Sequence, residues 1–433
     1  MSNYLDWQNK ISSDRKIVPL FYIADFSISP VDKIVKEEEE KVNLCNYTDV
    51  YKNTYITSDL EFMEGSASEN EINRFQIYDG DVLITKDSES WDDIGIPAIV
   101  VGNFQNTTLC GYHLALMRPK KNLVNPKFLF YCFESKKHRT QLEIEATGVT
   151  RFGIPKDAIG KYKIPLPSLE LQNKIVEYLD REIVKIDSLI EKKTKLIALL
   201  EEKKKTVINE AVTNGLDTTV TMKNSGIEWL GKIPKHWEVV KLKYFIDINY
   251  GLSQPPEYFD TGTPLIRATN IFRGKISKKD MVFIDADQLK SNKKIILKKG
   301  DIIIVRSGAY TADSAIIDEE FENSIAGFDM VIRSKNDLFS NFLAYVLLSD
   351  YMLNRQLIPM RIRAAQPHLN AEEVGSTTLI KPSLEEQKLI VQKLETFFQK
   401  NKESINLINN SINLLKEKRT TIISAAINGE IAL

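Results

Sequence analysis

The chain lacks the glycine patterns on which many nucleotide and methyl-donor sites depend. No two of its 19 glycines lie two positions apart, so Gly-x-Gly is absent from all 433 residues. This excludes the dinucleotide fingerprint and the glycine loop with which most methyltransferases hold their methyl donor. The run from Gly226 to Ile233 has the spacing of a phosphate-binding loop, but Ile233 stands where a Ser or Thr must hold magnesium. The sequence therefore predicts no nucleotide site.

Residues that form metal sites, disulfides or catalytic centres are also scarce. The three cysteines are odd in number and confined to the first half, which suits a reducing cytoplasm better than a disulfide framework. The four histidines are scattered, and no group of residues has the spacing of a zinc site. The Asn/Asp-Pro-Pro-aromatic tetrapeptide of amino-methyltransferases is missing. We expect no catalytic residue, no metal and no cofactor in this chain.

Long apolar runs and an excess of charge are missing as well. No stretch is apolar enough to cross a bilayer, and the first residues do not form a signal peptide, so we expect a cytoplasmic protein without a membrane partner. The 58 Lys and Arg are balanced by 59 Asp and Glu. A sequence-independent nucleic-acid binder usually has an excess of basic residues. If this chain binds nucleic acid, the positive charge must be local or supplied by a partner.

What the sequence does contain is a repeat. The decapeptide PSLELQNKIV at 167–176 returns as PSLEEQKLIV at 382–391. Further pairs follow at similar offsets, among them GDVLI at 80–84 with GDIII at 300–304, and Asn214-Gly215 with Asn428-Gly429. Small drifts in the offset are what loop insertions between matching elements leave behind. The chain is therefore predicted to be two halves with one architecture.

Each half is predicted to end in a long helix that carries a narrow apolar stripe. Spacings near three and four are typical of a coiled-coil seam, and Asn-Gly is typical of a helix C-terminus. The stripe residues in the first half are Ile175, Leu179, Ile183, Ile186, Ile190, Ile197, Leu200, Val207 and Ala211, and in the second half Ile390, Leu394, Phe397, Ile405, Ile408, Ile412, Leu415, Ile422 and Ala426.

A helix of about 45 residues is roughly 65 Å long, which is more than its own domain can cover. We therefore expect the two helices to pair as an antiparallel coiled coil, with internal pseudo-twofold symmetry and one globular segment at each end. The alternative is that each helix folds back on its own domain. The globular segments are predicted to be β-rich, with buried strands at Asp81–Thr85 and Asp301–Val305, so the fold class is α+β.

The motifs at the starts of the helices carry a family resemblance. The runs KIPLPSLELQ at 163–172 and IKPSLEEQ at 380–387, with Trp229-Leu-Gly231 followed by Ile233-Pro-x-His-Trp-Glu238, resemble the DNA-specificity (S) subunit of type I restriction-modification enzymes. The first half departs from this pattern, because it lacks the full Trp-Leu-Gly…Ile-Pro-x-His-Trp-Glu motif. Only Asp6-Trp7 and the region of Ile17–Leu20 correspond to that motif there. The resemblance spans nearly the whole chain.

The resemblance implies a domain layout and a set of partners. The layout would be a first target-recognition domain at 1–166, a spacer helix at 167–215, a linker at 216–226, a second target-recognition domain at 227–381 and a second spacer helix at 382–433. Each domain would read one half of a bipartite site in double-stranded DNA. Methylation subunits would dock on the helices, and restriction subunits would join them. Those partners would bind the methyl donor and ATP.

Base edges and phosphates are contacted mainly by Arg, Lys, Asn, Gln, Ser and Thr side chains. Polar clusters follow both predicted buried strands, and a further cluster precedes each helix, where the resemblance implies a DNA-facing loop. Trp91 and Phe152 are expected to pack rather than to stack on bases. The DNA-binding candidates in the first half are Lys86, Ser88, Ser90, Thr147, Thr150 and Arg151, and in the second half Arg267, Thr269, Asn270, Arg273, Arg306, Ser307, Tyr310, Thr311, Arg361, Arg363, Gln366 and His368.

Two other functions are compatible with the same pattern. An orphan two-headed coiled-coil scaffold, or a decoy that regulates a restriction system, would use this architecture to bind proteins instead of DNA. A nuclease with an unrecognised site is the third hypothesis, and the absence of a carboxylate and lysine cluster argues against it.

Overall fold

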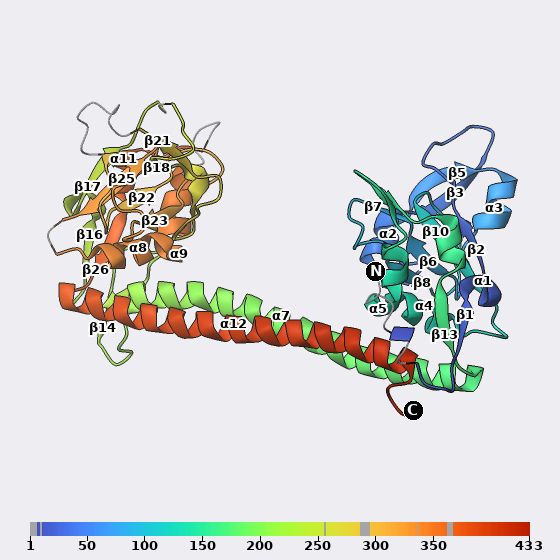
Figure 1. The fold of residues 1–433 in the computed structure, drawn as a ribbon. Helices are drawn as coiled ribbons and strands as arrows, with labels where there is room; N and C mark the ends of the chain where they lie inside the picture. Colours follow the sequence, from blue (N-terminus) through green and yellow to red (C-terminus); the bar gives the residue numbers. More distant parts are fainter. Residues whose placement is uncertain (1–6, 9–10, 255–256, 286–294, 336, 362–366) are drawn as a thin grey trace. The chain divides into compact units, whose positions relative to one another are not determined.

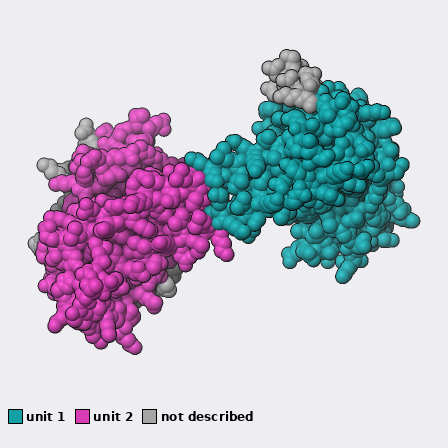
Figure 2. Space-filling model, turned by 90° about the horizontal axis from the view of Figure 1, so that it is seen from below, with its two compact units in different colours: residues 1–193, 410–433 teal, residues 194–409 magenta. Residues whose placement is uncertain are grey.

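The computed structural model describes residues 7–8, 11–254, 257–285, 295–335, 337–361 and 367–433. The chain divides into two compact units, residues 1–193 with 410–433 and residues 194–409 (Figure 2). Each unit contains its own sheets and helices, which confirms the predicted α+β class. Within the described ranges, no helix combines the length and the apolarity that a membrane span requires.

The first unit is built on a five-stranded sheet with the order β2-β10-β6-β8-β4. Figure 1 labels β2, β10, β6 and β8 of this sheet. The strands are β2 (Ala24–Ile28), β10 (Leu114–Pro119), β6 (Val82–Thr85), β8 (Pro97–Val100) and β4 (Tyr55–Ile56). Helices α4 (Pro126–Glu134) and α5 (Lys136–Glu143) contribute to the same core. A second sheet of β5 (Met63–Ala67), β3 (Glu40–Cys45) and β9 (Thr108–Cys110) closes a smaller core.

The second unit repeats the central part of this arrangement. Its four-stranded sheet has the order β17-β25-β22-β23, in which β22 is flanked as β6 is in the first unit. The strands are β17 (Ile246–Tyr250), β25 (Met330–Ser334), β22 (Ile302–Ile304) and β23 (Ser314–Ile316), and α8 (Ser340–Leu348) packs beside them. A further sheet joins β21 (Val282–Ile284), β18 (Thr263–Ile266) and β24 (Ile325–Ala326).

The two predicted buried strands are confirmed as β6 and β22, whose residues are all buried. In each unit, an aspartate just before the strand is buried and accepts hydrogen bonds from an arginine on the neighbouring strand. Arg118 Nη2 lies 2.8 Å from Asp81 Oδ2, and Arg333 Nη2 lies 2.9 Å from Asp301 Oδ2. The Asp81 carboxylate raises the pKa of Arg118. Because a buried carboxylate needs a charged partner, this pair fixes the two central strands of each sheet in the same way.

Each long helix is preceded by a strand that closes its domain. Strand β13 (Lys163–Leu166) pairs with β1 (Lys16–Pro19) before α7 (Leu169–Asn214), and β26 (Thr378–Lys381) pairs with β16 (Glu238–Lys241) before α12 (Leu384–Asn428). The region near Ile17 is therefore the counterpart of the strand that follows Trp237 in the second half.

One glutamine of the repeated decapeptide makes the same hydrogen bonds in both halves. Gln172 and Gln387 are fully buried at the starts of the two helices. Gln387 Oε1 accepts from the Phe339 backbone N–H at 2.8 Å, and its Nε2 donates to the carbonyls of Asp337 and Pro382 at 2.9 and 3.0 Å. Gln172 makes the same three bonds in the first unit, to Asn125, Leu123 and Pro167. A single amide thus satisfies three buried or half-buried backbone groups where strand, loop and helix meet.

The two helices pair in antiparallel order in both units. In the first unit, Ile175 and Leu179 near the start of α7 share a core with Ile423 and Ile427 near the end of α12. In the second unit, Ala211 and Val212 near the end of α7 share a core with residues 390–394 near the start of α12. The predicted stripe residues are all buried or half-buried. Both helices end at the predicted asparagine, and the following glycines have φ values of +78° and +82°.

The glutamine contact predicts a specific loss of stability. Gln387→Ala would leave three backbone groups, one buried and two half-buried, without this partner, so we expect it to lower the free energy of unfolding by roughly 2–4 kcal/mol. Urea denaturation followed by tryptophan fluorescence measures this change. Gln392→Ala, at an exposed position of the same helix, is the control and should change stability by less than about 0.5 kcal/mol. Equal effects of the two substitutions would contradict the assignment.

Candidate nucleic-acid interface

In the first unit, the two predicted polar clusters lie in one small sheet. Strand β7 (Asp87–Ser88) follows β6, and β11 (Thr147–Gly148) and β12 (Phe152–Gly153) form the hairpin before the first long helix. The sheet has the order β11-β12-β7, with Ser88 opposite Phe152. The hairpin needs a glycine at position 148, because a Cβ atom there would lie 1.9 Å from the Arg151 carbonyl oxygen. The fold therefore joins two clusters that are some 60 residues apart.

The candidates of the first unit differ in exposure. Thr147, Thr150 and Arg151 are exposed on the β11–β12 hairpin. Lys86 is half-buried, and its Nζ lies 2.7 Å from Asp87 Oδ1. Ser88 is buried, and its Oγ accepts from the backbone N–H of Ser90, which is exposed and bonds through its hydroxyl to Asp92.

The two aromatic residues near these candidates behave differently. Phe152 is half-buried and packs against the core of the unit, as expected. Trp91 is 48% exposed, so its ring is only partly covered, and the expectation that it packs rather than stacks on bases stays a prediction. The exposure follows from its place in a polar turn after β7, between Ser90 and Asp92, where the chain runs along the surface.

In the second unit, three polar clusters meet. Ser307 forms a β-bridge with His368, and the backbone N–H of Leu369 donates to the Arg306 carbonyl at 2.8 Å. Arg361 Nη1 donates to the carbonyl of Thr311 at 2.8 Å. The ring of Tyr310, which is exposed, meets that of Phe272 edge-on, next to Arg273, which is also exposed. Arg363 and Gln366 lie outside the described residues.

Two candidates of the second unit face inward. Asn270 is fully buried, and its side-chain amide donates to the carbonyls of Ser277 and Lys279. Thr311 is buried as well, and its Oγ1 donates to the Gly308 carbonyl at 2.6 Å. These side chains hold the loops in shape, and their polar groups are occupied within the chain.

Arg306 is held through both its backbone and its guanidinium group. Its guanidinium carbon lies 4.6 Å from the centre of the Tyr250 ring and 4.2 Å from the centre of the Phe328 ring. Its backbone N–H donates to Asp329 Oδ1 at 3.1 Å, and its Nη2 lies 3.5 Å from His368 Nε2. Stacking on aromatic faces is a geometry that arginine favours. We call Tyr250 and Phe328 the aromatic clamp.

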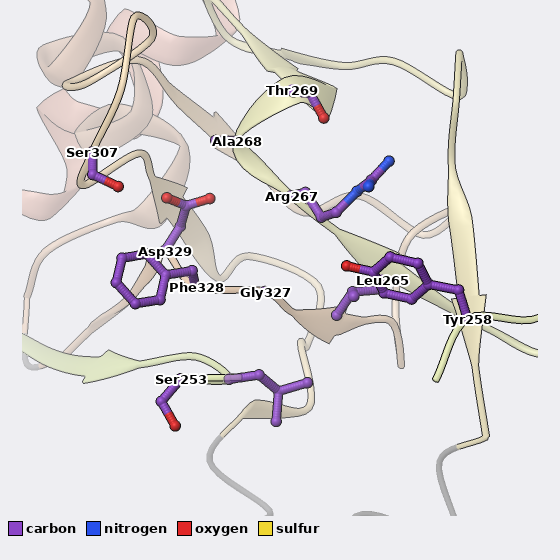
Figure 3. Close-up of a pocket in the computed structure, with 11 residues that line it drawn as sticks. Ser253, Tyr258, Leu265, Arg267, Ala268, Thr269, Ser307, Gly327, Phe328 and Asp329 are labelled. Carbon is purple, nitrogen blue, oxygen red and sulfur yellow. The ribbon is translucent and has the colours of Figure 1, made fainter. Parts of the chain in front are cut away.

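A cavity of about 340 Å³ lies next to the clamp. Figure 3 shows Ser307, Phe328 and Asp329 on one side of this cavity and Arg267, Thr269 and Tyr258 on the other. The cavity therefore joins candidates from the first and second polar clusters of this unit. Arg267 donates from Nη2 to the Asp280 carbonyl at 2.6 Å, and its guanidinium lies over the Tyr258 ring.

Several charged atoms around this cavity are buried without a partner. Within the described part of the chain, Arg267 Nε, Arg306 Nε and Asp329 Oδ2 have no hydrogen-bond acceptor or donor. Burial raises the pKa of Asp329 from 3.8 to about 6, although the Arg306 N–H and guanidinium oppose this shift. Such unsatisfied groups are rare in folded proteins and are concentrated at functional sites.

The two units hold equivalent residues in equivalent places. Lys86 lies five positions after Asp81 in the sequence, and Arg306 lies five positions after Asp301. The Ile154 N–H donates to the Lys86 carbonyl as the Leu369 N–H does to that of Arg306, at 2.9 and 2.8 Å. The scaffold therefore presents one basic side chain at the same point in each unit.

Sequence reasoning missed Tyr250, Phe328 and Asp329. Tyr250 is the last residue of β17, and Phe328 and Asp329 lie just before β25. No motif in the sequence marks these three residues as neighbours of Arg306. The repeat could have indicated Asp329, because Asp329 immediately precedes β25 as His113 immediately precedes β10. Both residues accept from the backbone N–H of a basic residue. Asp329 accepts from Arg306 through its carboxylate, and His113 accepts from Lys86 through its carbonyl.

The raised pKa of Asp329 predicts a pH-dependent gain of stability in Asp329→Asn. Because its folded pKa of about 6 exceeds the ordinary value of 3.8, ionisation of Asp329 lowers stability as the pH rises through this interval. The asparagine side chain keeps the acceptor for the Arg306 N–H and removes the charge. We expect the substitution to stabilise the protein by roughly 2–3 kcal/mol at pH 8 and by almost nothing near pH 4.

Thermal unfolding at both pH values measures this difference. Asp260→Asn, at an exposed position of the same unit, is the control and should shift the midpoint little at either pH. A variant that is no more stable than the wild type at pH 8 would show that the Asp329 charge carries no cost.

Comparison with known proteins gives the family. The model of the type I restriction modification DNA specificity domain matches the chain twice, at residues 26–202 and 234–414. The type I restriction enzyme MjaVIII specificity subunit of Methanocaldococcus jannaschii is 27% identical over 286 residues, which cover 65% of each chain. The EcoKI specificity subunit of Escherichia coli is 21% identical over 405 residues, which cover 91% of this chain and 83% of that subunit.

Two solved structures share the fold. A chain from a study of complex assembly and conformational transition in a type I R-M system has a TM-score of 0.72 at 16% identity, with 97% of this chain and 99% of that chain covered. The HsdS subunit from Thermoanaerobacter tengcongensis has a TM-score of 0.57 at 18% identity, with 97% and 98% covered. With a family domain that matches in both halves, the chain belongs to the type I restriction-modification DNA specificity family.

Proposed function

We propose that this protein is the non-catalytic DNA-recognition subunit of a type I restriction-modification complex. Each of its two domains reads one half of a bipartite site in double-stranded DNA. The observation that carries this proposal is the duplicated family domain, in which the same scaffold presents a polar surface with a basic side chain at the same point in each copy. The polar clusters of the second unit contain the exposed Arg273 and the half-buried Arg267, Arg306 and Arg361, although the chain as a whole carries a net charge of −1.

The paired helices act as the spacer between the two readers. Along B-DNA, the separation of two recognition elements also fixes the face of the double helix that each one meets. A coiled coil of defined length keeps that separation constant, because its seam locks the register of the two helices.

The helices also offer docking surfaces for methylation subunits. Outside the seam, several large apolar side chains of the two helices are exposed, and a partner that covered them would bury apolar surface. Leu407 is 70% exposed and Val184 is 66% exposed. Further exposed side chains on the helices are Leu169, Leu189, Leu196, Leu199, Leu389 and Leu414. The methylation subunits would bind the methyl donor, and the restriction subunits that join them would bind ATP.

A map of methylated bases in the source genome, with this gene intact and deleted, tests the function. We expect deletion to abolish methylation at one motif made of two short parts around a fixed gap. An unchanged map would reject the recognition role and favour the protein-binding scaffold or decoy.

The spacer role predicts that helix length sets the gap in the DNA site. Insertion of one heptad after Lys195 in α7 and one after Ile408 in α12 keeps the seam in register and adds about 10 Å. We expect the gap to grow by about three base pairs, at ~3.4 Å per base pair, while both half-sites stay the same. The methylated motif of the variant measures this. An insertion after Thr218, in the linker, is the control and should leave the gap unchanged, and an unchanged gap after the helix insertions would rule out the spacer role.

A further inference from the structure

Arg306 is fixed at both its backbone and its side chain. Its N–H donates to Asp329 Oδ1, and its carbonyl accepts from Leu369, so the residue cannot shift along the surface. The clamp rings hold the guanidinium from two sides, at 4.6 and 4.2 Å. The Tyr250 ring is itself held, because its hydroxyl accepts from the Ala371 N–H at 2.9 Å.

The clamp lies at the surface. Tyr250 is 43% exposed and Phe328 is 45% exposed, although large aromatic side chains of this kind are usually covered. Arg306 is half-buried between them, and its Nε is buried without a partner in the described ranges. The terminal nitrogens are therefore the donors that a ligand can reach, although Nη2 already has a long contact, 3.5 Å, with His368 Nε2.

A clamped arginine has lost much of its rotamer freedom before binding. Ordering a free arginine side chain costs entropy when it binds, and pre-ordering removes that cost. The fixed fork of donors suits a target with two neighbouring acceptors in one plane. In the major groove, guanine presents N7 and O6 in this way, and the other three bases do not.

A phosphate is the competing target for an arginine. Arg306 differs from the exposed Arg273 because the buried Asp329 carboxylate accepts from its backbone, and this negative charge disfavours a phosphate at the same place. A flexible, exposed arginine suits phosphate contacts better than a clamped one, because a phosphate accepts from many directions.

We propose that Arg306 reads a guanine in the half-site bound by the second unit, through paired hydrogen bonds to N7 and O6, and that Tyr250 and Phe328 are the positioning residues. This inference rests on the proposed function. Lys86 occupies the equivalent point in the first unit, but its partner there is the Asp87 carboxylate. The two half-sites are therefore read by different chemistry on one scaffold.

The test uses the full chain, co-expressed with the methylation subunits of its system, and reads the methylated motif by sequencing. Arg306→Gln and Arg306→Lys should relax one G·C pair in one half-site, with a loss of preference of roughly tenfold or more, because neither side chain keeps the paired donors. The other half-site should stay unchanged. Lys86→Gln is the matched control, and any change that it causes should fall in the opposite half-site.

The clamp is tested separately with Phe328→Leu, which keeps an apolar side chain. We expect it to weaken the preference at the same base pair without changing which base is preferred, a result that a merely structural role would not give. This variant also decides the matter if the Arg306 variants abolish methylation.

Three results would overturn the inference. The affected half-site could lack a G·C pair, the Arg306 variants could leave the motif unchanged, or all sequences could be bound more weakly to the same extent, as for a phosphate contact. Each of these leaves the bipartite motif of the wild type in place. Failure of the proposed function looks different, because deletion of the gene would then leave the methylation map unchanged.

Discussion

The apolar stripe of each long helix is the constraint on which the rest of the structure depends. A helix of 46 residues, as in α7, is too long to be covered by the domain that precedes it. The stripe is buried only because α12 carries a matching one and runs in the opposite direction. The repeat in the sequence is thus a physical requirement, since each half supplies the surface that the other half lacks.

What repeats between the halves is the scaffold, and what differs is the surface that it carries. Gln172 and Gln387 make the same three bonds, and the pairs Asp81–Arg118 and Asp301–Arg333 join the same two strands. The positions above this scaffold are free to change, because none of these bonds involves them. A fold of this kind can therefore keep its geometry while the residues that face a ligand vary.

Much of this architecture could be predicted from the sequence because it depends on periodic patterns and short repeats. Such patterns predict the apolar stripe, the helix ends at Asn214 and Asn428, and the buried strands. The surface was harder to predict, since a polar residue that supports a loop looks the same in sequence as one that is exposed. Asn270 and Thr311 are DNA-binding candidates by their polarity, yet their side chains bond to carbonyls inside the unit. The residues around Arg306 were missed for a different reason, because the clamp joins strands far apart in the chain.

The two polar surfaces also differ in how far their own groups are satisfied. In the first unit, the Asp87 carboxylate contacts two side chains. Its Oδ1 lies 2.7 Å from Lys86 Nζ, and its Oδ2 lies 2.6 Å from His113 Nδ1. In the second unit, Arg267 Nε, Arg306 Nε and Asp329 Oδ2 are buried without a partner in the described ranges, and the Asp329 charge is buried at a cost to stability. A ligand that contacts the first surface through Lys86 must compete with an existing ion pair, whereas the clamp already holds Arg306 with donors to spare. The second unit therefore leaves polar atoms without a partner at a place where the first unit pairs its own, and unsatisfied buried groups of this kind cost stability.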